Sequence, residues 1–120
     1  MKKIMIIEDD ITMRQLLSTL LNMEGYIILS CDINSEEEIL NSITDQNPDG
    51  VLIDIHLHGI NGLNLLKQLR SNLFIKQPKV LMTSGMDMAI ESQESGADGF
   101  LLKPYMPDDL IQALRKFFQQ

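Results

Sequence analysis

Four short apolar runs in this chain each end directly before residues that can bind a metal ion or a phosphate. The runs cover residues 4–7, 51–53, 80–82 and 100–102. They are followed by Glu8, Asp9 and Asp10, by Asp54, by Thr83 and Ser84, and by Lys103 and Pro104. Runs this short, bounded by turn residues, indicate buried strands of a parallel sheet. Ligands of open α/β sheets bind beyond the carboxyl ends of the strands, so one sheet edge is predicted to carry every reactive group.

Amphipathic stretches of helical length separate the apolar runs. The first is predicted to begin at an Asp10 cap and to stop at Gly25. Its apolar stripe is Met13, Leu16, Leu17, Leu20 and Leu21. Ser35 and Glu38 have the spacing of a capping box, and the helix that they open must end before Pro48.

Three more helices are predicted in the second half of the chain. One begins near residues 61–62, a weaker one covers residues 87–95, and the last has Pro107 in its first turn. The inward side chains expected for the first and last of these are Leu63, Leu66, Leu69, Leu110, Ile111, Leu114, Phe117 and Phe118. With a further strand at residues 26–29, five strands and five helices alternate. This pattern predicts an α/β fold with a flavodoxin-like, doubly wound five-stranded parallel sheet in the order 2-1-3-4-5.

Composition restricts the classes of partner. A chain of 120 residues with 44% hydrophobic residues fits one domain, residues 1–120. Its net charge of −7, with 10 basic residues, argues against binding to nucleic acid or to an anionic membrane. Cys31 is the only cysteine, so an internal disulfide is excluded and we assign the thiol no role. With no signal peptide or membrane-spanning run, a cytoplasmic protein is expected.

The polar residues at the strand ends predict magnesium and phosphate chemistry. Converging carboxylates of Glu8, Asp9 and Asp54 would repel each other by about 4 kcal/mol per pair at about 4 Å with an effective dielectric near ~20. A Mg²⁺ ion, which prefers oxygen ligands, would relieve this repulsion, and Lys103 would add a second positive charge. Asp54 can then act as a nucleophile toward phosphorus, with the Thr83 hydroxyl donating to a phosphoryl oxygen. The set predicts a phosphoryl acceptor.

In this order, the residues resemble the receiver domain of bacterial two-component response regulators, particularly the stand-alone chemotaxis-type receiver. The resemblance covers essentially the whole chain. Its elements are Glu8 and Asp9, Asp54 followed by Gly62, Thr83, residues 96–100, and the segment Lys103–Pro104–Tyr105. It implies a signalling switch controlled by phosphorylation, whose only catalysis is its own phosphoryl transfer and autodephosphorylation. The implied partners are a sensor histidine kinase or phosphotransfer protein and, downstream, a protein partner or a C-terminal effector domain.

The resemblance also implies a role for each matching residue. Asp54 would accept the phosphoryl group from a phosphohistidine. Asp9 and Asp54 would bind Mg²⁺ directly, together with the backbone carbonyl of His56, and Glu8 would act through a metal-bound water. Lys103 would pair with the phosphoryl group.

Two further residues would convert phosphorylation into a change of shape. Thr83 would bond to the phosphoryl group and move, with Ser84 as the alternative hydroxyl, and Phe100 would turn inward. The face formed by the fourth helix, fifth strand and fifth helix would change. In the family the peptide bond at the position of Lys103–Pro104 is often cis.

The loop after Asp54 departs from the family pattern. His58 stands where many relatives have Pro, and His56 replaces a smaller polar residue. The alternating histidines suggest a zinc or manganese site only weakly, because a third spaced His or Cys is missing, and solvated loop side chains are the favoured interpretation. The His56 side chain could shield the acyl phosphate or orient a water molecule, so the sequence does not determine the rate of dephosphorylation.

Two other classes of protein fit parts of the pattern. A magnesium phosphohydrolase with an aspartyl-phosphate intermediate would carry a second Asp where His56 stands, if it were of the haloacid-dehalogenase type. A flavin-binding domain of the same fold would need a phosphate-cradling loop after the first strand, where Glu8, Asp9 and Asp10 would repel a phosphate. The sequence therefore favours the receiver domain over both.

Overall fold

Five parallel strands form the central sheet of the protein. The computed structural model describes residues 1–119. The strands are β1 (Lys3–Ile7), β2 (Ile27–Leu29), β3 (Gly50–Asp54), β6 (Lys79–Ser84) and β7 (Gly99–Leu102). They lie in the order β2-β1-β3-β6-β7, and all four neighbouring pairs are parallel. Counted along the chain within this sheet, this is the predicted order 2-1-3-4-5, so the fold class is confirmed.

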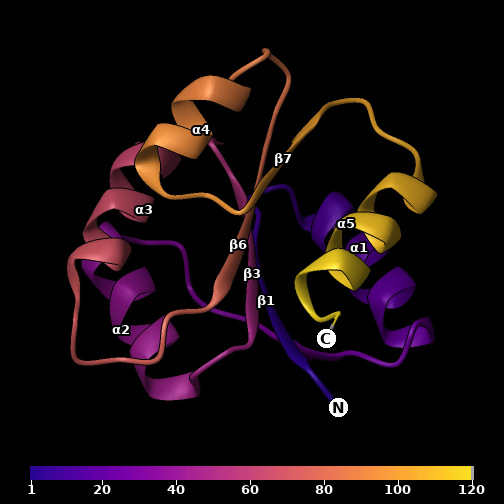
Figure 1. Cartoon of the computed structure of the whole chain (residues 1–120), viewed down its shortest axis with the longest axis horizontal. Coiled ribbons are helices and arrows are strands. Elements are labelled where there is room, and N and C mark those ends of the chain that lie inside the picture. Colours follow the sequence, from indigo (N-terminus) through magenta and orange to yellow (C-terminus); the bar gives the residue numbers. More distant parts are fainter. Residues whose placement is uncertain (120) are drawn as a thin grey trace.

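Helices cover both faces of the sheet. Within the described residues they are α1 (Ile11–Met23), α2 (Glu36–Gln46), α3 (Gly62–Ser71), α4 (Ala89–Ser95) and α5 (Pro107–Phe117). Figure 1 shows α1 and α5 on one face and α2, α3 and α4 on the other. Each layer encloses its own apolar core, since alternate residues of the central strands point to opposite faces. Ile4, Ile6 and Leu52 face α1 and α5, whereas Met5 and Ile53 pack on the other side.

The predicted helix starts are largely present. The Asp10 carboxylate accepts the Met13 N–H (3.1 Å) at the start of α1. The Ser35 hydroxyl accepts the Glu38 N–H at 3.1 Å, but the Glu38 carboxylate accepts from the Asn34 side chain, so only half of the predicted capping box forms. Asn47 ends α2 in the left-handed conformation, directly before Pro48.

Two inward assignments need correction, and one buried leucine was not predicted. Leu16 was expected in the apolar stripe of α1, but it is 61% exposed, because Leu17 and Leu21 already fill the contact with the sheet. Leu65, not predicted to be inward, is fully buried in α3 beside Leu66. Ile111 is only half-buried in α5, on the margin of its apolar face.

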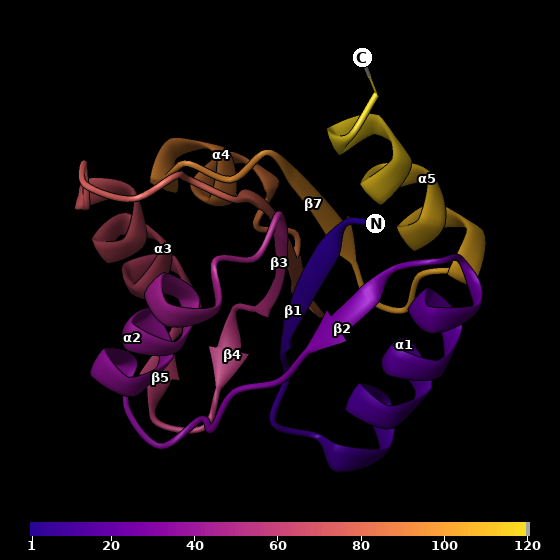
Figure 2. The same ribbon diagram turned by 90° about the horizontal axis from the view of Figure 1, so that it is seen from below.

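A short antiparallel hairpin follows β3 and was not predicted. Its strands are β4 (His56–Leu57) and β5 (Ile60–Asn61). Figure 2 shows it between the end of β3 and α3. Two-residue strands give too little alternation for a period to be visible in the sequence. The hairpin lies beside the strand end that carries Asp54, so it forms part of the surroundings of the candidate site.

The single cysteine of the chain, Cys31, is buried. Burial raises the pKa of the Cys31 thiol to about 11, which keeps it protonated and fits a structural residue. Among residues 1–119, no helix combines the length and the apolar character needed to span a bilayer.

Candidate functional site

The strand ends bring the predicted site residues together at one edge of the sheet. β3 lies between β1 and β6, and its last residue, Asp54, is the register partner of Thr83. Glu8 and Asp9 directly follow β1. Glu8, Asp54 and Thr83 are buried, whereas Asp9 is half-buried. The sheet topology therefore forms a pocket from residues as distant in sequence as 8 and 83.

Lys103 is the cation of this cluster. Its ammonium lies 2.9 Å from Asp54 Oδ2 and 3.9 Å from Glu8 Oε1. The Lys103 N–H donates to the Ser84 carbonyl at 2.8 Å, and the peptide bond that follows, to Pro104, is cis. One ammonium thus faces two buried carboxylates.

The crowding of carboxylates changes the acidity of Glu8. Burial, followed by hydrogen bonding to Asp54, raises the pKa of Glu8 to about 7, while the charge of Lys103 acts in the opposite direction. A glutamate with this pKa is only partly ionised near neutral pH. An additional cation bound beside Glu8 would favour its ionised form and so offset this shift.

The three carboxylates fit a hard metal ion. Glu8, Asp9 and Asp54 each offer an oxygen, and these atoms all lie within 4.8 Å of one another. Mg²⁺ is typically held by one or two carboxylates and keeps other positions for water and phosphate oxygens. A donor set made only of carboxylate oxygens suits Mg²⁺ better than zinc, which favours nitrogen and sulfur.

The two histidines of the β4–β5 hairpin lie differently from the expectation. The His56 N–H donates to Asp54 Oδ1 at 3.2 Å, which holds the start of the hairpin against Asp54, while the residue itself is exposed. His58 was expected to be a solvated loop side chain. Its ring is exposed, but both its backbone N–H (2.8 Å) and its ring Nδ1 (3.0 Å) contact Asp9 Oδ2.

These contacts affect the acidity of Asp9. Burial raises its pKa, but the hydrogen bonds from the His58 ring and backbone outweigh burial, so the pKa of Asp9 lies below its usual value. Asp9 is thus held as a carboxylate, the form that binds a metal. The only signal for this contact in the sequence was the departure from Pro at position 58, since Pro has no N–H to donate.

Gly62 explains how closely α3 approaches the site. A Cβ at this position would lie 2.7 Å from Ile55 Cα and 2.9 Å from the Asp54 carbonyl oxygen, both backbone atoms. The Gly62 N–H also donates to the Ile55 carbonyl at 2.8 Å. The first turn of α3 therefore packs against the backbone that presents Asp54, and any larger side chain would displace it.

The two candidate hydroxyls have different surroundings. Thr83 lines the small cavity that also contains Asp54, Lys103 and Glu8. Ser84 is not among the residues that line this cavity, and its hydroxyl accepts the Met86 N–H at 3.0 Å within its own turn. This geometry favours Thr83 over Ser84 as the group that meets a phosphoryl oxygen.

Tyr105 is a wall of the same cavity that the sequence identified only as part of a motif. It lines the cavity with Glu8 and Lys103. Burial, with the negative charges of Glu8 and Asp54, raises the pKa of Tyr105 to about 12. The phenol therefore remains protonated and limits solvent access to this side of the carboxylates.

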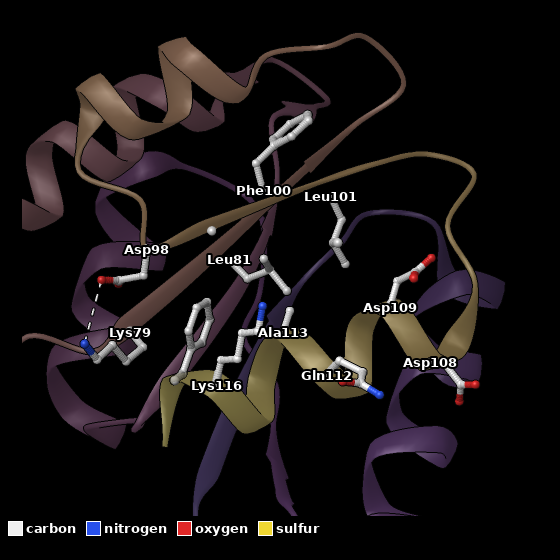
Figure 3. Close-up of a pocket in the computed structure, with 12 residues that line it drawn as sticks. Lys79, Leu81, Asp98, Phe100, Leu101, Asp108, Asp109, Gln112, Ala113 and Lys116 are labelled. Carbon is white, nitrogen blue, oxygen red and sulfur yellow. Dashed lines mark ion pairs between the residues drawn. The ribbon is translucent and has the colours of Figure 1, made fainter. Parts of the chain in front are cut away.

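Phe100 lies on β7, on the side away from α5. Its half-buried ring packs against the core under α2, α3 and α4. Figure 3 shows it directed toward α4, above a pocket of about 780 Å³ between β7 and α5. Lys79 and Asp98, whose charged groups are 3.9 Å apart, lie at one end of this pocket. Phe100 is thus placed between the end of the sheet near the site and the surface of α4, β7 and α5.

Comparison with known proteins gives a consistent result. The family model of the response regulator receiver domain matches residues 4–115. The phosphate regulon transcriptional regulatory protein PhoB of Pseudomonas aeruginosa is 31% identical over 117 residues, covering 95% of this chain and 50% of that protein. The chain spans about half the length of the curated relatives that it matches.

Solved structures share the fold over nearly the whole chain. A CheY-like response regulator receiver domain from Methylobacillus flagellatus has a TM-score of 0.84 at 28% identity and covers 98% of both chains. The response regulator protein TrrA of Thermotoga maritima, solved in complex with Mg²⁺-BeF, has a TM-score of 0.84 at 28% identity, covering 98% of this chain and 100% of that one. All four strand ends that carry the candidate site residues lie within residues 4–115, the range that the family model matches.

Proposed function

The chain belongs to the response regulator receiver domain family of two-component systems, and on that premise we propose that it is a switch controlled by phosphorylation of Asp54. The phosphoryl group comes from a phosphohistidine on a sensor kinase or on a phosphotransfer protein. Residues 1–120 act as one receiver domain. The output is a changed surface of α4, β7 and α5.

A single observation carries this proposal. Asp54 is a buried carboxylate with the Lys103 ammonium at 2.9 Å on one side and Thr83 as its register partner on the other. A carboxylate placed only for stability has no need of a hydroxyl and a second acidic group around it. A phosphoryl acceptor needs both, because the transferred group brings three oxygens whose charge must be met by donors and cations.

The carboxylates fit Mg²⁺ as argued above. Asp9 and Asp54 would hold the ion directly, with the backbone carbonyl of His56, and Glu8 would contact it through water. When bound, Mg²⁺ neutralises charge on the oxygens of the transferred phosphoryl group. Burial and Asp54 raise the pKa of Glu8, and a cation bound beside it would favour the ionised form.

The chain's own residues perform the transfer. An oxygen of Asp54 attacks phosphorus, the P–O bond forms as the P–N bond of the phosphohistidine breaks, and the released imidazole nitrogen takes up a proton. Lys103 moves its contact from the carboxylate to the phosphoryl oxygens. Thr83 donates a hydrogen bond from its hydroxyl to one of these oxygens. Hydrolysis by water later returns the carboxylate and inorganic phosphate, so the domain resets itself.

The new contacts bias the output surface. Drawing Thr83 toward the phosphoryl group leaves room beside β6 into which the Phe100 ring can turn. About 5.5 kcal/mol of differential stabilisation moves such an equilibrium from mostly off to mostly on, and several charge-assisted hydrogen bonds are of this order. The altered surface then controls a protein partner or an effector domain.

Phosphorylation by a small donor tests the proposal. Incubation with acetyl phosphate and Mg²⁺ should add one phosphoryl group to the wild type, as measured by intact mass, and none to Asp54→Asn. Asp45→Asn, at an exposed position of α2, is the matched control and should be phosphorylated like the wild type. Failure of the wild type to gain mass, or an equal gain by Asp54→Asn, would contradict the proposal. Multiple turnover of phosphate esters would instead favour a phosphohydrolase.

A further inference from the structure

The tip of the β4–β5 hairpin is tied to Asp9 across 49 residues of sequence. His58 is the first residue of the two-residue turn, and Gly59 follows it with a φ of +70°, which lets the chain reverse at once. This turn directs the His58 N–H at Asp9 Oδ2 (2.8 Å). The ring Nδ1 lies 3.0 Å from the same oxygen. One carboxylate oxygen thus has two donors from one residue.

The contact is too exposed to be explained by stability. The His58 side chain is fully exposed, and Asp9 is 26% exposed, so solvent screens their interaction. Exposed pairs of this kind contribute little to the free energy of unfolding. What the two donors do fix is the orientation of the carboxylate. Both hydrogen bonds go to Oδ2, so Oδ1 takes part in neither of them. Asp9 offers one carboxylate oxygen to the cluster with Glu8 and Asp54.

We propose that His58 is a positioning residue that orients Asp9 for Mg²⁺ through its ring Nδ1–H and its backbone N–H. The inference rests on the proposed function, in which Asp9 is a metal ligand. Carboxylates that bind metals are themselves oriented by outer hydrogen bonds, and losing such a partner typically weakens metal binding by about 10- to 100-fold. A ring bond to an exposed carboxylate belongs at the lower end of that range.

The identity of residue 58 gives the proposal its specificity for this chain. A Pro at this position has neither a backbone N–H nor a polar side chain, so it would supply neither bond. In this protein the hairpin tip and the metal site are therefore connected directly. Binding of Mg²⁺ and the position of the hairpin should depend on each other.

Magnesium binding by the unphosphorylated protein tests the ring contact. Calorimetric titration with Mg²⁺ is compared for the wild type, His58→Leu and His58→Asn. We expect His58→Leu to bind about tenfold more weakly, since it keeps the backbone N–H but loses the ring donor. His58→Asn places an amide N–H at a similar distance along the side chain and should restore most of the affinity. Urea unfolding of the metal-free variants should be nearly unchanged.

A second measurement does not depend on metal binding. In nitrogen-15 NMR spectra of the metal-free protein, at a pH where the ring is neutral, His58 should carry its proton on Nδ1, the nitrogen that faces Asp9. A proton on Nε2 would overturn the proposal. So would equal Mg²⁺ affinities of wild type and His58→Leu, or a His58→Asn variant as weak as His58→Leu. If the wild type does not bind Mg²⁺, the metal site of the proposed function fails together with this inference.

Discussion

Helix α3 follows β3 through the β4–β5 hairpin, and α4 follows β6. Both strands end at the site, yet the two helices are held in very different ways. α3 begins with a complete cap, because the Asn61 side-chain oxygen accepts the N–H groups of Leu63 (2.9 Å) and Asn64 (3.3 Å). It has ten residues, and its buried side chains are all apolar: Leu65, Leu66 and Leu69. Its first residue, Gly62, lies directly on the backbone of Asp54 and Ile55.

α4 has neither feature. It has seven residues, and in the described chain its N-cap, Met88, makes no side-chain hydrogen bond to the helix. Its buried residues are Ser92 and Ser95, not leucines. The Ser92 hydroxyl is the one buried side-chain polar atom within residues 1–119 that lacks a hydrogen-bond partner. A buried hydroxyl without a partner costs about 1–3 kcal/mol.

The two helices are joined at one end. Arg70, near the end of α3, donates from Nε to the carbonyl of Gly96, the C-cap of α4, at 2.9 Å, and from Nη2 to Asp98 at 2.9 Å. The C-terminal end of α4 is therefore tied to α3. At its N-terminal end the Ala89 N–H donates to Asp87 Oδ1 at 3.3 Å, which is longer than the bonds from Arg70. α3 thus packs against the backbone that presents Asp54, and in the proposed switch α4 is the helix that is expected to respond.

Of the changes considered, a methyl group at Gly62 should lower the stability of the protein most, because it disturbs the start of α3. Gly62→Ala places a Cβ 2.7 Å from Ile55 Cα, and backbone cannot yield cheaply, so we expect a loss of about 2 kcal/mol in the free energy of unfolding. Gly85→Ala, in the loop before α4, is the matched control, because its Cβ meets nothing within 4 Å. It should change stability by less than about 0.5 kcal/mol in urea unfolding. Equal losses would show that α3 and the loop before α4 are held alike.

The pH dependence of stability tests the crowding of carboxylates at the strand ends that precede both helices. The pKa of Glu8 is raised from 4.5 to about 7 in the folded protein, so the folded state binds a proton that the unfolded state has released. Stability of the metal-free protein should therefore fall as the pH rises from about 4.5 to about 7 and level off above.

Glu8→Gln should remove this part of the pH dependence, because an amide does not titrate in this range. Glu37→Gln, at an exposed position of α2, should keep it. Urea unfolding at several pH values in the presence of a chelator measures both. A Glu8→Gln variant with the pH dependence of the wild type would show that other groups cause it.

Removing the cap of α3 should make its start resemble that of α4. Asn61→Ala leaves the N–H groups of Leu63 and Asn64 without their acceptor, and should cost about 1 kcal/mol. Asn61→Ser retains a capping oxygen and should lose much less. Faster amide hydrogen exchange in residues 62–66 of the alanine variant, and not of the serine variant, would sharpen the assignment of rigidity to the cap.

The smallest expected effect is a gain in stability on removing the Ser92 hydroxyl. Ser92→Ala removes the hydroxyl that lacks a partner and introduces a better helix former, so stability should rise by about 0.5–1 kcal/mol. Ser18→Ala, in α1, removes a hydroxyl that donates to the Arg14 carbonyl at 2.8 Å, and is the control that should gain less. A destabilised Ser92→Ala would mean that the hydroxyl has a hydrogen-bond partner that contributes to the stability of α4.

The sequence was sufficient for the parts of the fold that depend on local periodicity. The strands, their order and the helix starts at Asp10, Asn61 and Pro107 are as predicted, because apolar runs and capping residues act over a few neighbours. Leu16 was misplaced because a stripe of leucines does not reveal which of them the sheet leaves uncovered. The roles of the site residues remain predictions that the geometry supports.

The tertiary contacts around the site were beyond local patterns. A residue other than Pro at position 58 does not by itself show that His58 contacts Asp9, since the contact depends on how a hairpin packs against another strand end. The difference between Thr83 and Ser84 also required coordinates, because only they show that Thr83 lines the cavity with Asp54 and Lys103. The raised pKa of Glu8 depends on burial and on Asp54, both consequences of the sheet order.

Hydrogen exchange with and without phosphorylation tests the central claim most directly. Exchange of the segments 62–71 and 85–99 is followed by mass spectrometry for the wild type and Asp54→Asn, with and without acetyl phosphate and Mg²⁺. The account predicts that exchange changes in residues 85–99 of the wild type, stays the same in residues 62–71, and does not respond in Asp54→Asn. A change of equal size in both segments, or one that persists in Asp54→Asn, would contradict it.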